Sequence, residues 1–363
     1  MIGNLSTFRP AAYVGDSKAR RDVIHGRLPA GKVVLLAGAG GSGKSTLLLQ
    51  IAEALQNGMG TAFGGDISGT FRGLPCILML GEDSRDTLDL RLQTIRAKQG
   101  SKPVDDRGLY IPCPDLEQSA RLVVRDDYSR NIVPTEAFTW LEEAIEAEAA
   151  MHGGVALVAI DTFTALLGVD SNSAEDVQGC YNLLARLARK HDCCVIVTHH
   201  LNKGTQQDSR QRIRGSTAVV DGVRAAYVLE QVDKGEAARM IKMAGLDPDR
   251  DLLRVTLQKD NLGLSRKPIY YLREVSGYLL DISHLVGEQD DPEAALLAIV
   301  RQFNEVDQVV KKTGTQGLYT HLSDNWPRSL QSREKVTRVA NALLEDGRLT
   351  VDPKTQGLVA VIG

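Results

Sequence analysis

The sequence predicts an α/β protein whose central sheet is mainly parallel, followed by a smaller C-terminal domain. Short, almost continuous apolar runs alternate along the chain with longer stretches of helical pattern. Such runs are typical of strands that helices cover on both faces, and a strand–helix–strand rhythm indicates parallel strands. The apolar runs are Val33–Ala37, Cys76–Leu80, Val155–Ile160, Cys193–Thr198, Ala225–Leu229 and Leu252–Leu257. The main helical stretches are Ser45–Gln56, Thr135–Met151 and Ala174–His191.

The same rhythm predicts three parts: an N-terminal segment (1–28), an α/β core (29–285) and a C-terminal domain (286–363). The polar stretch Gly287–Pro292 marks the last boundary. Beyond it stand three helical patterns and two apolar runs around a turn, which is a β-hairpin pattern and predicts a winged-helix-like domain. The helices are expected at Glu293–Asn304, near Gly317–Ser323 and at Ser332–Asp346. Its nine basic and eleven acidic residues leave a protein-contact or packing module as an equal alternative.

The composition excludes several classes of protein. Apolar residues make up 43 % of the 363 residues and charged residues 25 %, which excludes a collagen-like or wholly disordered chain. A formal net charge of −3 excludes a protein that coats nucleic acid by bulk positive charge. No apolar run is long enough to span a membrane and no signal-peptide pattern stands at the start, so we expect a cytoplasmic protein. Its five cysteines form no C-x-x-C pair, which favours reduced thiols.

A glycine-rich loop follows the first predicted strand and opens the first predicted helix. Residues Gly38–Ser45 match G-x-x-x-x-G-K-[ST], the phosphate-binding loop of nucleotide-binding proteins. The glycines let backbone N–H groups face phosphate oxygens, and the helix N-terminus adds positive potential. We expect Lys44 to reach the β- and γ-phosphates of ATP and the Ser45 hydroxyl to ligate Mg²⁺. The predicted nucleotide-binding residues are Gly38, Gly40, Gly41, Ser42, Gly43, Lys44, Ser45 and Thr46.

Two carboxylates stand at strand ends, where ligands bind in open α/β sheets. Asp161 ends the strand Val155–Ile160 and is the second predicted Mg²⁺ ligand. The next residue is Thr162, so the base that activates water must come from elsewhere. Glu82 follows a neighbouring strand and is the predicted base, with Asp83 as the alternative.

A pair of histidines, His199 and His200, ends the strand Cys193–Thr198. Side chains alternate along a strand, so only one of the two can enter the nucleotide site. A polar side chain at this point can touch the γ-phosphate and report its loss. A metal site at this pair is the weaker alternative, because no third ligand is suitably spaced.

Over about residues 26–275 these motifs together resemble the RecA-fold family of hexameric ATPases, most of all the plasmid RepA-type replicative helicases. The segments that carry the resemblance are Gly26–Gly31, Gly81–Asp83, His199–Lys203, Arg214–Ser216 and Lys259–Gly263. The resemblance implies a RecA-like P-loop NTPase core, with Glu82 as the catalytic base and His200 as the γ-phosphate sensor. The family places a finger arginine where this chain has Asn261, so the trans-acting finger is expected at Arg214, at Lys259 or at both.

The resemblance also implies a DNA-binding loop that follows the sensor strand. Residues 201–213 carry Lys203, Arg210 and Arg212, with Asp208 as the only acid. A polar loop with a small basic excess suits contacts to DNA phosphates, although a solvated surface loop is the alternative. No aromatic residue is present for base stacking, which indicates backbone tracking.

The resulting prediction is a homo-oligomeric, hexameric, Mg²⁺-dependent ATPase that translocates on single-stranded DNA. It would unwind duplex DNA in plasmid, phage or mobile-element replication, with a replication initiator or a primase as a further partner and no membrane contact. A recombinase-like filament on DNA and a nucleotide-switched regulatory or assembly ATPase remain as alternatives. DNA-stimulated turnover and a closed ring distinguish the three.

Overall fold

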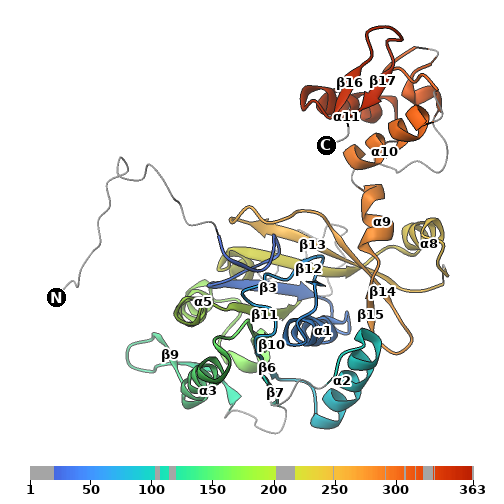
Figure 1. Ribbon diagram of the computed structural model, residues 1–363. Helices are drawn as coiled ribbons and strands as arrows, with labels where there is room; N and C mark the ends of the chain where they lie inside the picture. Colours follow the sequence, from blue (N-terminus) through green and yellow to red (C-terminus); the bar gives the residue numbers. More distant parts are fainter. Residues whose placement is uncertain are drawn as a thin grey trace.

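A nine-stranded sheet forms the centre of the molecule (Figure 1). The computed structural model describes residues 20–102, 107–113, 120–201, 217–247, 249–290, 292–305, 308–314, 316–321, 330 and 332–361. Across the sheet the strand order is β15-β14-β13-β12-β3-β11-β10-β6-β7. Their bounds are β3 Lys32–Gly38, β6 Cys76–Leu80, β7 Leu109–Pro112, β10 Leu157–Asp161, β11 Cys194–His200, β12 Ala225–Gln231, β13 Leu252–Asp260, β14 Ile269–Arg273 and β15 Leu279–Asp281.

The strands from β7 to β12 are parallel, and β13, β14 and β15 continue the sheet as an antiparallel meander. This confirms the predicted α/β core with a mainly parallel sheet. Asp161 pairs with Leu80, and His200 pairs with Gly38. The carboxyl ends of β3, β6, β10 and β11 therefore meet at one edge of the sheet, where the phosphate loop begins.

Helices cover both faces of the sheet because each strand is apolar on both sides. On one face α1 (Lys44–Gln56) and α2 (Arg85–Gln99) pack against residues such as Val34 and Leu36. On the other face, α3 (Glu136–His152) and α5 (Ala174–His191) pack against the strand residues that alternate with these, such as Leu35. The shorter helices are α4 Phe163–Leu166, α7 Thr217–Asp221, α8 Lys234–Met243 and α9 Ser283–Asp290.

Local sequence explains why the long helices begin and end where they do. Ser84, Thr135 and Ser173 each accept a hydrogen bond from the amide three residues later, at the starts of α2, α3 and α5. Left-handed residues end the same helices at Gly100, Gly153 and Asp192.

Before the C-terminal region, three small described hairpins lie outside the main sheet: β1 (Asp22–Ile24) with β2 (Leu28–Pro29), β4 (Thr61–Ala62) with β5 (Gly65–Asp66), and β8 (Val123–Arg125) with β9 (Ile132–Pro134). The first hairpin lies largely within the predicted N-terminal segment (1–28), whose boundary stays a prediction. Val23, Ile24 and Leu28 are fully buried in the same apolar cluster as α1. This part of the chain thus belongs to the core, because its apolar side chains pack against the sheet.

The C-terminal region has its own apolar core and lies beyond α9 (Figure 1). It contains α10 (Pro292–Glu305), the 3₁₀ helix η3 (Leu318–His321), α11 (Arg333–Glu345) and the hairpin of β16 (Leu349–Val351) with β17 (Leu358–Ala360). The winged-helix-like assignment stays a prediction. At the predicted boundary α9 extends to Asp290, and Pro292 opens the next helix, a position that proline favours. The boundary itself stays a prediction. No helix in the described parts is long and apolar enough to cross a membrane.

Candidate nucleotide-binding site

A cavity of about 410 Å³ lies at the carboxyl edge of the parallel strands, over the start of α1. It brings together Lys44, Glu82, Asp161 and His200, four residues from separate segments that the sequence predicts for one site. Their roles stay predictions, but the sheet gives them a common location. The complete lining is Gly41, Ser42, Gly43, Lys44, Ser45, Thr46, Glu82, Asp83, Arg91, Thr94, Ile95, Asp161, His200, Arg273, Ser276, Gly277 and Tyr278.

The loop between β3 and α1 has the geometry of a phosphate cradle. Gly41 and Gly43 have φ angles of +70° and +103°, which only glycine adopts readily. A Cβ on Gly40 or Gly41 would meet no atom within 4 Å, so the loop borders open space. The Ser42 hydroxyl is buried without a hydrogen-bond partner, and no side chain caps the start of α1. Unpaired donors at a helix N-terminus fit a phosphate group.

Lys44 is buried at the base of this loop. Its Nζ donates to the carbonyl oxygens of Gly38 and Ala39, both at 3.0 Å, and lies 3.3 Å from His200 Nδ1. Burial lowers the pKa of Lys44, while the nearby charges of Asp161 and Glu82 act to raise it. The ammonium is therefore held by weak neutral partners, which a phosphate oxygen can replace.

His200 connects Lys44 to Glu82. Its other ring nitrogen, Nε2, lies 2.9 Å from Glu82 Oε1. The Glu82 side chain is 54 % exposed, so water reaches this carboxylate. The resulting line of Lys44, His200 and Glu82 joins the predicted phosphate ligand to the predicted base.

Asp83, the alternative base, is engaged elsewhere. It forms an ion pair with Arg91 of α2, and its side chain is largely buried. Burial raises the pKa of Asp83, and the Arg91 charge opposes that shift. A carboxylate that already pairs with a guanidinium is a poorer acceptor for a proton from water, so the geometry favours Glu82.

Asp161 and Ser45 supply the oxygen ligands expected for Mg²⁺. Asp161 is buried at the end of β10 and accepts a hydrogen bond from the Thr198 hydroxyl of β11. Both Asp161 and Ser45 line the cavity. One carboxylate and one hydroxyl beside a phosphate cradle match the way Mg²⁺ binds, with phosphate and water completing its shell.

His199 points to the opposite side of β11 from His200, as strand alternation requires. It is buried and meets the edge of Phe163, with ring centroids 5.8 Å apart. Burial lowers the pKa of His199 to about 4, and the neighbouring His200 and Lys44 contribute to the shift. The two histidines therefore do not face one common ligand.

His199 should make the protein less stable in mild acid. In the unfolded chain His199 is protonated below about pH 6.5, whereas in the folded chain its pKa is about 4. The free energy of unfolding therefore falls as the pH falls from about 6.5 to 4. Between about pH 7.5 and pH 5 the loss from this residue should be about 2 kcal/mol. Urea unfolding of the wild type and of His199→Gln at both pH values measures it. An equal loss in both proteins would contradict the assignment.

Arg273, at the end of β14, is a site residue that the sequence does not reveal. Its Nη2 donates to the carbonyl oxygens of Ser42 at 2.7 Å and Gly41 at 3.2 Å, so it braces the phosphate loop from outside. The hairpin that carries it is fixed to α1, because the Gln50 side-chain amide bonds both the N–H and the C=O of Leu279. No local motif marks Arg273, since it reaches the loop only through the antiparallel meander.

Lys259 does not line the cavity. It lies on β13 opposite Ala226, near the start of β12, and donates to the carbonyl oxygens of Asp221 at 2.7 Å and Val220 at 3.2 Å. The other predicted finger and the DNA-binding residues fall outside the described residues. They are Arg214, Lys203, Arg210 and Arg212.

Comparison with known proteins adds a family match. A family model described as an AAA domain matches residues 4–206, which include Lys44, Glu82, Asp161 and His200. No curated protein matches the chain. The crystal structure of the RadB recombinase is 16 % identical, with a TM-score of 0.43, over 70 % of this chain and 92 % of that chain. A KaiC-like protein from Pyrococcus horikoshii OT3 is 13 % identical, with a TM-score of 0.41, over 72 % of this chain and 99 % of that chain. The resemblance to RepA-type helicases stays a prediction.

Proposed function

The chain belongs to the AAA domain family, and we propose that it is a ring-forming, Mg²⁺-dependent ATPase that moves on single-stranded DNA and unwinds duplex. It is a P-loop NTPase with an α/β RecA-like core. The observation that best supports a hydrolytic motor is the line from Lys44 through His200 to Glu82 inside one cavity. It joins the residue that would meet the γ-phosphate to the one that would activate water.

The residues divide the chemistry between them. Loop amides and Lys44 would bind the phosphates, and Ser45 and Asp161 would hold Mg²⁺, which supplies charge neutralisation when bound. Glu82 would orient the attacking water and accept its proton as the bond from the water oxygen to γ-phosphorus forms, while the bond from γ-phosphorus to the β,γ-bridging oxygen breaks and ADP leaves. We propose that a γ-phosphate at Lys44 displaces His200 Nδ1 from the Lys44 ammonium. His200 would therefore differ in position between the ATP and ADP states.

We further propose that a second subunit completes the site. Within the described residues two arginines line it, and both are occupied: Arg91 pairs with Asp83, and Arg273 bonds the loop carbonyls. Charge that develops on the γ-phosphate is commonly stabilised by an arginine finger. We assign that role to Arg214 of a neighbouring copy, with Lys259 as the alternative. Such a finger requires a homo-oligomer, which we propose to be a hexamer.

Arg214→Ala should therefore bind ATP but hydrolyse it about 10³-fold more slowly, since a finger contributes about that much to turnover. ATP binding by equilibrium dialysis and basal hydrolysis without DNA are the two measurements. Arg250→Ala, an exposed arginine outside the cavity, is the control and should behave like the wild type. Normal basal hydrolysis by Arg214→Ala would exclude Arg214 as the finger and leave Lys259 as the candidate.

The DNA part of the proposal rests on chain order. Residues 202–216 follow shortly after β11 in the chain, and we propose that a shift of His200 on loss of the γ-phosphate is passed on to them. Lys203, Arg210 and Arg212 in that segment would contact DNA phosphates without reading bases. A replication initiator or a primase would be a further partner.

The decisive experiment measures ATP turnover with and without single-stranded DNA, together with electron microscopy in a non-hydrolysable ATP analogue. Stimulated turnover and closed rings are the expected results. Stimulation with open filaments would favour a recombinase-like protein. Turnover that ignores DNA would favour a nucleotide-switched regulatory or assembly ATPase.

A further inference from the structure

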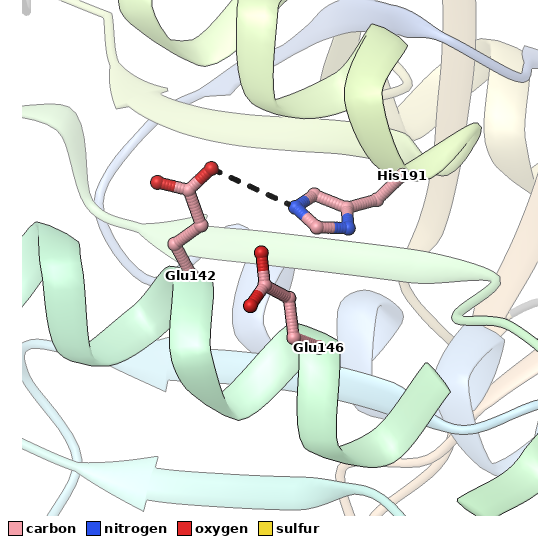
Figure 2. Close-up of side chains that lie close together, drawn as sticks. All are labelled: Glu142, Glu146 and His191. Atoms are coloured by element: carbon pink, nitrogen blue, oxygen red, sulfur yellow. Dashed lines mark ion pairs between the residues drawn. The ribbon is translucent and has the colours of Figure 1, made fainter. Parts of the chain in front are cut away.

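A second cluster of ligand-type side chains lies away from the nucleotide cavity, between α3 and the end of α5 (Figure 2). Glu142 and Glu146 stand one helical turn apart on α3, and His191 is the last residue of α5. Figure 2 shows both carboxylates and the imidazole turned toward one another. One ligand atom from each of the three residues lies within 4.8 Å of the others.

His191 provides evidence for a ligand that is independent of the two acidic residues. Its side chain is only 8 % exposed, and its Nε2 atom is buried without a hydrogen-bond partner. This nitrogen points into the cluster, 3.9 Å from Glu142 Oε1. That separation is an ion-pair distance but too long for a hydrogen bond, so Nε2 keeps an unused lone pair or N–H that an added ligand could satisfy.

A cation already rests against the carboxylates. Lys190 Nζ lies 2.6 Å from Glu142 Oε1 and 2.8 Å from Glu146 Oε1. The Lys190 side chain is 52 % exposed, so it can swing into water without disturbing the core. The C-terminus of α5 adds negative potential, which favours a positive charge at this place.

We propose that Glu142, Glu146 and His191 form a binding site for a divalent transition-metal ion such as Zn²⁺, with the Lys190 ammonium occupying the site when metal is absent. An imidazole nitrogen with two carboxylates suits Zn²⁺ or Co²⁺, whereas Mg²⁺ and Ca²⁺ prefer oxygen ligands alone. Ligands about 2.0–2.1 Å from a tetrahedral ion are roughly 3.4 Å apart, so small side-chain movements close the site around the ion. Water would supply the fourth ligand.

The bound ion would fasten α3 to α5 on the sheet face opposite α1. None of its three ligands lines the nucleotide cavity, so the proposal does not depend on the ATPase function. An ion that binds the folded state alone also raises the stability of the fold.

The test uses the full chain, freed of metal with a chelator and kept in excess Mg²⁺. Zn²⁺ affinity is measured by competition with a chromophoric chelator, Co²⁺ coordination by its visible absorption, and stability by Tm with and without Zn²⁺. The five cysteines in the chain are buried, which keeps thiols out of the measurement. The wild type should bind one Zn²⁺ at this site, show Co²⁺ bands and gain Tm.

Three variants make the result specific. His191→Gln should weaken Zn²⁺ binding by about tenfold or more, since even the loss of a residue that only orients a metal ligand costs about 10–100-fold. Lys190→Met should tighten binding, because the competing ammonium is gone. His152→Gln is the matched control: this histidine lies at the end of α3 beside Glu148, outside the cluster, and its loss should change nothing.

Two results would overturn the proposal. If His191→Gln and Lys190→Met, each folded by its Tm, bind Zn²⁺ as the wild type does, the cluster is an ion-pair network only. A wild type that shows neither Co²⁺ bands nor a Zn²⁺-dependent Tm leads to the same conclusion.

Discussion

Lys44→Ala should abolish ATP turnover, with a loss of more than about 100-fold from the missing charge at the phosphates. Lys44 Nζ bonds the loop carbonyls of Gly38 and Ala39 and lies 3.3 Å from His200 Nδ1. The two described arginines of the cavity are engaged elsewhere, Arg273 with the Ser42 carbonyl and Arg91 with Asp83. Steady-state phosphate release measures turnover, and fluorescent-nucleotide titration measures binding. Binding should weaken as well, because the same ammonium holds the ground state.

The fold should survive this change. Burial lowers the pKa of Lys44, so the folded state holds this ammonium at a free-energy cost that the variant removes. This gain offsets the loss of a positive charge near Asp161 and Glu82, and the Tm of Lys44→Ala should stay close to that of the wild type. Lys354→Ala, in the exposed turn between β16 and β17, is the matched lysine control and should keep full turnover. Near wild-type turnover by a folded Lys44→Ala protein would end the ATPase interpretation.

Glu82→Gln should stop hydrolysis while ATP stays bound. Glutamine keeps the size of the side chain and can still bond His200 Nε2, but it cannot accept a proton from water. We expect turnover to fall by about 10²–10⁴-fold, the usual contribution of a general base. Single-turnover hydrolysis and retention of labelled ATP on the protein separate the lost chemical step from lost binding.

Asp83→Asn is the control for this prediction, and we expect it to affect stability rather than hydrolysis. Asp83 pairs with the half-buried Arg91, so its loss should lower Tm more than it lowers the rate of the chemical step. If Asp83→Asn traps ATP and Glu82→Gln turns over normally, the two carboxylates have exchanged roles. The Tm of each variant shows whether a slow rate reflects the site or the fold.

Signals that lie within a few adjacent residues could be predicted from the sequence alone. The phosphate loop is one such signal, because its glycines, Lys44 and Ser45 act through the strand before it and the helix after it. The limits of α5 coincide with the predicted Ala174–His191, since Ser173 caps its start and the helix repeats apolar residues along one face. Strand ends could be predicted as well. The sequence therefore indicates that Asp161, Glu82 and His200 each stand at the carboxyl end of a strand.

The tertiary structure alone decided which of these residues meet. Parallel strands in the observed order bring Glu82 to His200 across 118 positions of sequence, and side-chain alternation then buries His199 on the other side. The role of Arg273 and the cluster at His191 could not be predicted from the sequence, since each depends on contacts between elements that lie far apart along the chain. Periodicity and local motifs report burial and backbone shape, whereas contacts between distant segments depend on how strands are ordered and helices are packed.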